Sequence, residues 1–169
     1  MLNGERDIYE DGYRLNVCMV LCNDANQVLI AQRNEGRNGW QFPQGGMHQG
    51  ESPLEAMYRE LNEEIGLRPY QVSVVAQTPR WLRYRLPAGR IPREISAIGQ
   101  KQRWFLLRLR SPDHAIDLRQ SAEETEFARW KWVDFWAPLQ HTRHFVRFKH
   151  HVYREALEHL STHIRHEAA

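Results

Sequence analysis

The sequence predicts an α+β fold in which a mixed β-sheet is sandwiched between α-helices. Apolar and β-branched runs occupy the first part and the middle of the chain, and amphipathic helical patterns follow the early strands and the later ones. The chain has 169 residues, of which 41% are hydrophobic and 26% are charged, which is enough to bury one core. We therefore expect a single domain over residues 1–169, with its core at about 11–160.

The first strands are predicted from two apolar runs. RLNVCMVLCN (14–23) and QVLIAQRN (27–34) are rich in β-branched and apolar side chains, and the turn-like residues 24–26 separate them. The stretch WQFPQGG (40–46) then predicts a short strand that ends at Pro43 and the glycines.

The first helix has clear signals at both ends. Ser52 is suited to be the N-cap, Pro53 suits the first helical position, and Glu55 completes a capping box. Gly66 supplies the stop. An apolar stripe at helical spacing is formed by Leu54, Met57, Tyr58, Leu61 and Ile65.

The remaining elements are further strands and a final helix. Strand-like runs cover residues 70–78, 80–86, 101–110 and 127–135. Residues 144–165 fit one amphipathic helix, whose apolar side consists of Phe145, Phe148, Val152, Ala156 and Leu160.

Charge is distributed unevenly along the chain. Residues 79–110 include nine basic side chains and one acidic side chain, so this segment carries +8 while the rest of the chain carries −6. The same segment contains the aromatic residues Trp81, Tyr84, Trp104 and Phe105. Basic and aromatic side chains together suit phosphate contacts and base stacking, so the segment indicates an anionic partner.

Membrane and disulfide classes are disfavoured. No apolar run approaches the roughly 20 residues that cross a bilayer, and the N-terminal stretch is too charged for a signal peptide. The only two cysteines, Cys18 and Cys22, would lie about 13 Å apart in a strand, beyond disulfide reach. We expect a cytoplasmic protein with no membrane partner.

Three carboxylates crowd the first helix. Glu60, Glu63 and Glu64 are three and four residues apart or adjacent, and residues at helical spacing have Cβ atoms about 5–6 Å apart. Like charges at about 4 Å repel by on the order of 4 kcal/mol at an effective dielectric constant near 20. A helix that only had to fold would spread these acids apart, so we expect a cation among them.

The spacing around these acids resembles the Nudix box, the signature of the Nudix hydrolase family. Each defined position of this 23-residue pattern is filled, by Gly45, Glu51, Arg59, Glu60, Leu61, Glu63, Glu64, Gly66 and Leu67. The resemblance implies a Nudix fold and hydrolysis of a nucleoside diphosphate linked to another moiety.

A divalent cofactor also follows from this resemblance. It implies Mg²⁺, with Mn²⁺ as a substitute, held by Glu60, Glu63 and Glu64, because Mg²⁺ prefers a few carboxylates completed by water and phosphate oxygens. Gly45 permits close approach of the backbone to the metal or to a phosphate. Arg59 is expected to pair with Glu51 or Glu63 rather than to touch substrate.

Stretches outside the box resemble the proteobacterial RNA pyrophosphohydrolases, which group with dinucleoside polyphosphate hydrolases inside the Nudix family. These stretches cover residues 11–17, 40–46, 81–87, 98–107, 126–133 and 148–154. The resemblance implies removal of pyrophosphate from a 5′-triphosphorylated or diphosphorylated RNA end, which leaves a 5′-monophosphate and promotes mRNA decay.

The same resemblance implies substrate-binding roles outside the acidic helix. It places Arg14 on a terminal phosphate and lets Arg33 and Phe148 clamp the base of the second nucleotide. Lys149, beside Phe148, would reach the RNA backbone. Glu126 would approach the metals and assist the attacking water.

Several alternatives stay open at this point. The general base is Glu60, Glu64 or Glu126, because Nudix enzymes vary here. The same residues would serve a dinucleoside polyphosphate hydrolase acting on diadenosine tetraphosphate, and a non-catalytic RNA- or nucleotide-binding module is a further alternative. The number of metals, the oligomeric state and any protein activator are not determined by the sequence.

Overall fold

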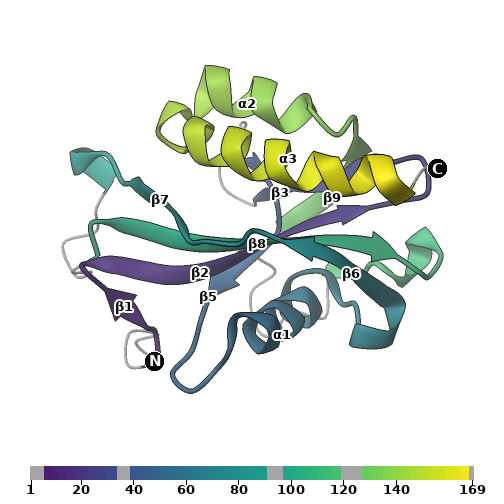
Figure 1. Cartoon of the computed structure of the whole chain (residues 1–169), viewed down its shortest axis with the longest axis horizontal. Coiled ribbons are helices and arrows are strands. Elements are labelled where there is room, and N and C mark those ends of the chain that lie inside the picture. The colour runs from purple at the N-terminus through teal and green to yellow at the C-terminus, as the bar shows by residue number, and fades with distance from the viewer. Residues whose placement is uncertain (1–5, 34–38, 91–96, 119–126, 168–169) are drawn as a thin grey trace.

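The protein forms a mixed β-sheet with helices on both faces, as the sequence predicts (Figure 1). The computed structural model describes residues 6–33, 39–90, 97–118 and 127–167. Within these ranges the strands are β1 (Tyr9–Glu10), β2 (Tyr13–Cys22), β3 (Val28–Arg33), β4 (Trp40–Gln41), β5 (Gln44–Gly46), β6 (Val72–Gln77), β7 (Leu82–Arg85), β8 (Gly99–Leu109) and β9 (Phe127–Val133). Short 3₁₀ turns occupy Pro69–Gln71, Ala88–Arg90 and Asp113–Ala115.

The two longest strands form the centre of the sheet. β2 and β8 run parallel, from the Tyr13–Gly99 pair to the Cys22–Arg108 pair, and the other strand pairs in the described ranges are antiparallel. The strand order is β4-β3-β2-β8-β6, with β1 and β5 paired to β2, β7 paired to β8 and β9 paired to β3. Parallel neighbours need a long crossover, and α1 lies within the connection between these two strands.

The stretch predicted as one short strand forms two. β4 pairs with β3, whereas β5 pairs with β2, and Pro43 lies between them. Proline has no N–H for a strand ladder, so only its carbonyl takes part, and it accepts from the Met19 N–H at 2.9 Å. The change of partner strand brings the two glycines of β5 beside the middle of β2.

Helix α1 (Pro53–Ile65) covers one face of the sheet. Its capping box is confirmed, because Ser52 Oγ accepts from the Glu55 N–H at 3.2 Å and a Glu55 carboxylate oxygen accepts from the Ser52 N–H at 3.3 Å. Gly66 ends the helix with a φ of 73°, which favours glycine. Of the predicted stripe, Met57, Leu61 and Ile65 are fully buried, whereas Leu54 is largely exposed.

The opposite face is covered by two helices, not by one. α2 (Ala137–Phe145) and α3 (Arg147–Glu167) are separated at Val146, whose φ of −140° is not helical. Phe145 was predicted on the buried side but is 54% exposed, because it ends α2 instead of continuing α3. Val152, Ala156 and Leu160 of α3 are buried as expected.

Two of the aromatic residues in the basic segment belong to the core, one on each face of the sheet. Trp104 and Phe105 of β8 are fully buried on opposite faces of the sheet, so the interpretation of these two as base-stacking residues is wrong. Cys18 and Cys22 are buried on one face of β2, as expected, and they form no disulfide bond. None of the helices in the described ranges combines the length and apolar composition of a membrane-spanning segment.

Candidate active site

Glu60 and Gly45 meet where α1 packs against β5. A Cβ atom added at Gly45 would overlap the Glu60 carboxylate, so only glycine leaves room for this side chain. Gly45 pairs with Val17, whose side chain lies in the core on the α1 side of the sheet. Glu60 is only 6% exposed. The middle of the acidic helix is thereby held directly against the β5 backbone.

Arg59 links the acids to this backbone. Its Nε lies 2.5 Å from Glu51 Oε1, and its Nη1 lies 2.8 Å from Glu60 Oε1 and 3.1 Å from Glu63 Oε2. Its Nη2 donates to the Gly46 carbonyl at 2.8 Å and to Glu51 Oε2 at 3.0 Å. The prediction that Arg59 pairs with Glu51 or Glu63 is confirmed, because Arg59 pairs with both, and Glu60 is a further partner.

Glu51 connects the loop before α1 to the helix. Burial alone would raise the pKa of its carboxyl, but the hydrogen bonds donated by Arg59 and by the His48 N–H outweigh burial and lower that pKa. The His48 N–H donates to Glu51 Oε2 at 2.8 Å. Glu51 therefore stays ionised and acts as a fixed acceptor.

Arg59 supplies a cation within the acidic helix itself. No set of three His, Cys, Asp or Glu side chains converges into a ready metal site in the ranges that the structure describes. The carboxylates nevertheless fit a cation completed by water and phosphate oxygens, because Glu60 is pressed against a glycine backbone and Glu64 lies 7% exposed one turn along. The Glu63 side chain is 51% exposed.

Arg14 lies on the other side of β5. Its Nε is 3.1 Å from Asp7 Oδ2, and a Cβ atom added at Gly46 would overlap its guanidinium group. Consecutive strand residues face opposite sides of a sheet, so Gly45 receives Glu60 on the α1 side while Gly46 receives Arg14 on the α3 side. Asp7, which orients Arg14, was not identified from the sequence, because nothing distinguishes it locally from neighbouring acids.

Phe148 and Lys149 form a separate aromatic–basic group. The Phe148 ring lies 5.7 Å from the Tyr84 ring, and Lys149 Nζ lies 5.5 Å from the Tyr84 ring centre. Arg33 is exposed at the end of β3. Glu126 lies outside the described residues.

Side-chain amides form a hydrogen-bonded layer, the amide floor, between Arg14 and the Phe148–Lys149 group. The sequence analysis did not predict this layer. Gln102 Nε2 donates to Asn16 Oδ1 and to Gln44 Oε1, both at 3.0 Å. Burial raises the pKa of the Tyr84 hydroxyl, which donates to Gln100 Oε1 at 2.8 Å. The alternation of Gln100 and Gln102 along one strand places both on one face and was the available signal.

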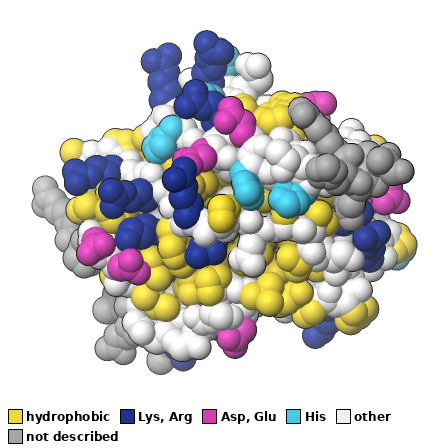
Figure 2. Space-filling view, viewed as in Figure 1, with side chains coloured by type: hydrophobic (Ala, Val, Ile, Leu, Met, Phe, Trp, Pro, Cys, Tyr) yellow, Lys and Arg dark blue, Asp and Glu magenta, His cyan; other side chains and the backbone are white. Residues whose placement is uncertain are grey.

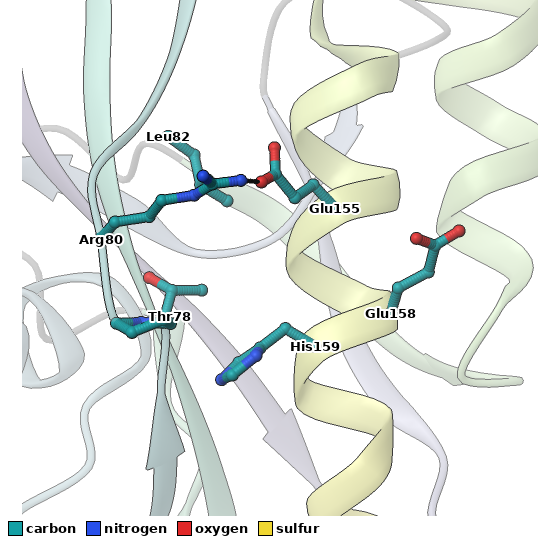
Figure 3. A pocket seen from close by; sticks show the side chains of 7 residues that line it. Thr78, Arg80, Leu82, Glu155, Glu158 and His159 are labelled. Atoms are coloured by element: carbon teal, nitrogen blue, oxygen red, sulfur yellow. Dashed lines mark hydrogen bonds and ion pairs between the residues drawn. The ribbon is translucent and has the colours of Figure 1, made fainter.

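A separate hollow of about 380 Å³ lies between the end of β6 and α3 (Figure 3). Arg80 crosses it and pairs with Glu155. Arg108, from the same basic segment, donates to the Asn23 carbonyl at 2.8 Å. Some of the excess positive charge between residues 79 and 110 therefore serves internal contacts rather than a ligand.

Comparison with known proteins decides the family. A model described as the NUDIX domain matches residues 12–155. The chain belongs to the Nudix family. As a Nudix hydrolase it acts on phosphoanhydrides and depends on a divalent metal.

Two Nudix relatives share about half of their residues with the chain. A protein of Francisella tularensis subsp. mediasiatica named RNA pyrophosphohydrolase is 49% identical, over 93% of this chain and 99% of its own length. A protein of Xylella fastidiosa with the same name is 54% identical, over 87% of this chain and 76% of its own length.

Solved structures confirm the Nudix fold. The E. coli dihydroneopterin triphosphate pyrophosphohydrolase has a TM-score of 0.65 and 22% identity, over 90% of this chain and 96% of that chain. A C. elegans Ap4A hydrolase in a binary complex has a TM-score of 0.58 and 19% identity, over 83% and 92%.

Proposed function

We propose that the chain removes pyrophosphate from 5′-triphosphorylated or diphosphorylated RNA and leaves a 5′-monophosphate end. The observation that carries this proposal is identity of 49% and 54% with proteins named RNA pyrophosphohydrolase, over most of the chain. The aligned stretch includes β5 and also Glu60 and Arg14, which lie against opposite faces of β5.

The acidic helix is the proposed metal-binding element. Glu60, Glu63 and Glu64, with the backbone of Gly45, would hold Mg²⁺ or Mn²⁺, which would screen the polyphosphate and polarise the attacking water. The contact of Glu60 with Gly45 supports this assignment, because no side chain at position 45 separates the β5 backbone from the Glu60 carboxylate. Glu126 would assist as a further acid, and the general base is one of Glu60, Glu64 and Glu126.

The polyphosphate would lie across the edge of β5. In the described part of the chain β5 pairs only with β2, and its glycines carry no side chain at this edge. Arg14, held by Asp7, would bind a terminal phosphate as a guanidinium fork. Phe148 and Arg33 would hold the base of the second nucleotide, and Lys149 would contact the RNA backbone.

The decisive experiment is product analysis on end-labelled triphosphorylated RNA with and without Mg²⁺. We expect release of pyrophosphate and a 5′-monophosphate product only with metal. Glu60→Gln and Glu64→Gln should fold normally and lose activity by several powers of ten, because each keeps its shape but loses the charge that binds metal. Near-wild-type turnover of both variants at saturating Mg²⁺ would contradict the metal assignment.

Diadenosine tetraphosphate is the competing substrate for the same residues. We expect kcat/KM on a triphosphorylated oligonucleotide to exceed that on diadenosine tetraphosphate, because Lys149 and the neighbouring basic side chains suit a nucleotide chain. A preference for diadenosine tetraphosphate would assign the chain to dinucleoside polyphosphate hydrolysis instead.

A further inference from the structure

A basic hollow lies where α2 meets α3, outside the active site described above. Its volume is about 600 Å³, and it is lined by Arg143, Arg147, His150 and Arg154. We call this group the α2–α3 basic hollow. Figure 2 shows Lys and Arg side chains gathered at the upper left, over the end of the helical layer where α2 leads into α3.

The helix break at Val146 creates this arrangement. Arg143 comes from the last turn of α2, whereas the other three residues lie at positions i, i+3 and i+7 of α3. At about 100° per residue, Arg147, His150 and Arg154 fall within roughly 60° of one another on one helix face. The N-terminal end of α3 adds the partial positive charge of a helix start, which favours an anion.

These charges have no evident role in holding the fold together. No carboxylate of the described residues pairs with Arg143, Arg147 or Arg154, in contrast to Arg59 and Arg80. All three guanidinium groups belong to exposed residues. Clustered like charges repel one another, so their grouping is explained best by an anionic ligand.

His150 is oriented for the same surface. Thr142 Oγ1 and His150 Nδ1 are joined by a hydrogen bond of 3.0 Å. This hydrogen bond fixes the ring, and a protonated Nε2 would donate to a phosphate. The hollow thus combines three guanidinium groups with one positioned imidazole.

We propose that the α2–α3 basic hollow binds backbone phosphates of the RNA chain downstream of the second nucleotide. This inference rests on the proposed function, and it extends the substrate from a 5′ end to a longer strand. The hollow shares the first turn of α3 with Phe148 and Lys149, whose side chains project roughly 100–160° around the helix from it. A strand leaving those residues would therefore pass around the start of α3 to reach the hollow. The four residues that line it are three arginines and one histidine, which suits contacts with phosphates.

The test compares two substrate lengths in Arg147→Gln/Arg154→Gln. We expect kcat/KM for a triphosphorylated RNA of about ten nucleotides to fall about tenfold, while the value for a triphosphorylated dinucleotide stays within about twofold. The slope of log kcat/KM against log salt for the longer RNA should become shallower by about 1.4, because two phosphate contacts to a single strand are lost. The Kd for the 5′-monophosphorylated RNA of the same length should rise about tenfold, which tests the site without catalysis.

Two further variants distinguish the loss of positive charge in the hollow from a general effect of substitution on the protein. Arg68→Gln/Lys131→Gln removes the same charge from two exposed positions outside the hollow, one after α1 and one on β9, and should leave kcat/KM for both substrates unchanged. Arg147→Lys/Arg154→Lys should retain most of the advantage of the longer RNA, because a phosphate still meets a positive charge.

The inference is overturned if Arg147→Gln/Arg154→Gln changes both lengths equally or changes neither. It is also overturned if this variant loses binding to vesicles of anionic phospholipid while the length dependence persists, which would assign the hollow to a membrane surface. Failure of the proposed function would look different, because the wild-type chain would release no pyrophosphate from either RNA while the change in Kd could still be measured.

Discussion

Single residues on β5 determine what can approach the acidic helix. Gly45 leaves space for the Glu60 carboxylate, and Gly46 leaves space for the Arg14 guanidinium on the opposite side of the strand. Arg59 holds Glu60 at 2.8 Å and binds the Gly46 carbonyl. The positions of the charged groups therefore depend on the lack of a side chain at Gly45 and Gly46 as much as on the charged residues themselves.

Replacement of Gly45 by alanine tests this dependence. The added methyl group would overlap the Glu60 carboxylate and displace it, and misplacement of a catalytic group by about 1 Å can lower activity about 100-fold. We expect Gly45→Ala to lose at least that factor in kcat/KM, measured with triphosphorylated RNA.

Gly89→Ala is the matched control for this prediction. A Cβ atom at Gly89 would meet no described atom within 4 Å, so this variant should retain wild-type kcat/KM. Full activity in Gly45→Ala would mean that the contact between Gly45 and Glu60 is not needed for hydrolysis.

Helix α1 depends as an element on the loop that precedes it. The capping box ties its first turn together, and the Glu51–Arg59 pair attaches the loop to its middle. Glu51 also accepts from the His48 N–H, so one carboxylate joins loop, helix and, through Arg59, β5.

The lowered pKa of Glu51 predicts a specific acid sensitivity. A carboxyl whose pKa is lower in the folded state stabilises the fold above its unfolded value and loses this contribution as pH falls through the folded value. We therefore expect the free energy of unfolding to fall as pH drops below the ordinary value of 4.5, and Glu51→Gln to lack this part of the decrease. Urea unfolding between about pH 6 and pH 3 measures both.

Glu158→Gln provides the control at this scale, because Glu158 is an exposed glutamate on α3. Its unfolding should keep the pH dependence of the wild type. An unchanged dependence in Glu51→Gln would show that Glu51 does not contribute to acid unfolding.

Across the whole molecule, the sheet separates two kinds of chemistry. Helix α1 lies on one face of the sheet and α3 on the other (Figure 1). Phe148 and Lys149 of α3 contact Tyr84 of β7. β5 contacts Glu60 on one face and Arg14 on the other. A polyphosphate at the edge of β5 would therefore lie within reach of the residues on both faces.

Cation binding at α1 should be detectable in the stability of the whole chain. A ligand that binds only the folded state at about 100 times its Kd adds about 2.7 kcal/mol to the free energy of unfolding. We expect Mg²⁺ to raise the Tm of the wild type and of Glu158→Gln, but to have little effect on Glu60→Gln/Glu64→Gln. Equal shifts in all three proteins would place the stabilising cation elsewhere.

Local patterns were sufficient for most elements and for the ion pairs of Arg59 on the acidic helix. The capping box, the stop at Gly66 and the pairing of Arg59 with Glu51 follow from residues at most eight positions apart, whose contacts a helix start and its loop already define. The amide floor and the Asp7–Arg14 pair were missed. The floor depends on which strands become neighbours, and Asp7 has no local feature that marks it as the partner of Arg14.

The sequence by itself determined the Nudix pattern, the strand-rich α+β class and the helix that carries Glu60, Glu63 and Glu64. Only the tertiary structure decided that Pro43 divides one predicted strand into two, that Val146 divides one predicted helix into two, and that Trp104 is buried. The physical reason is the distance along the chain over which each interaction acts. Helix signals act over one or two turns, whereas strand partners, burial and the approach of Glu60 to Gly45 depend on the packing of segments that are distant in the chain.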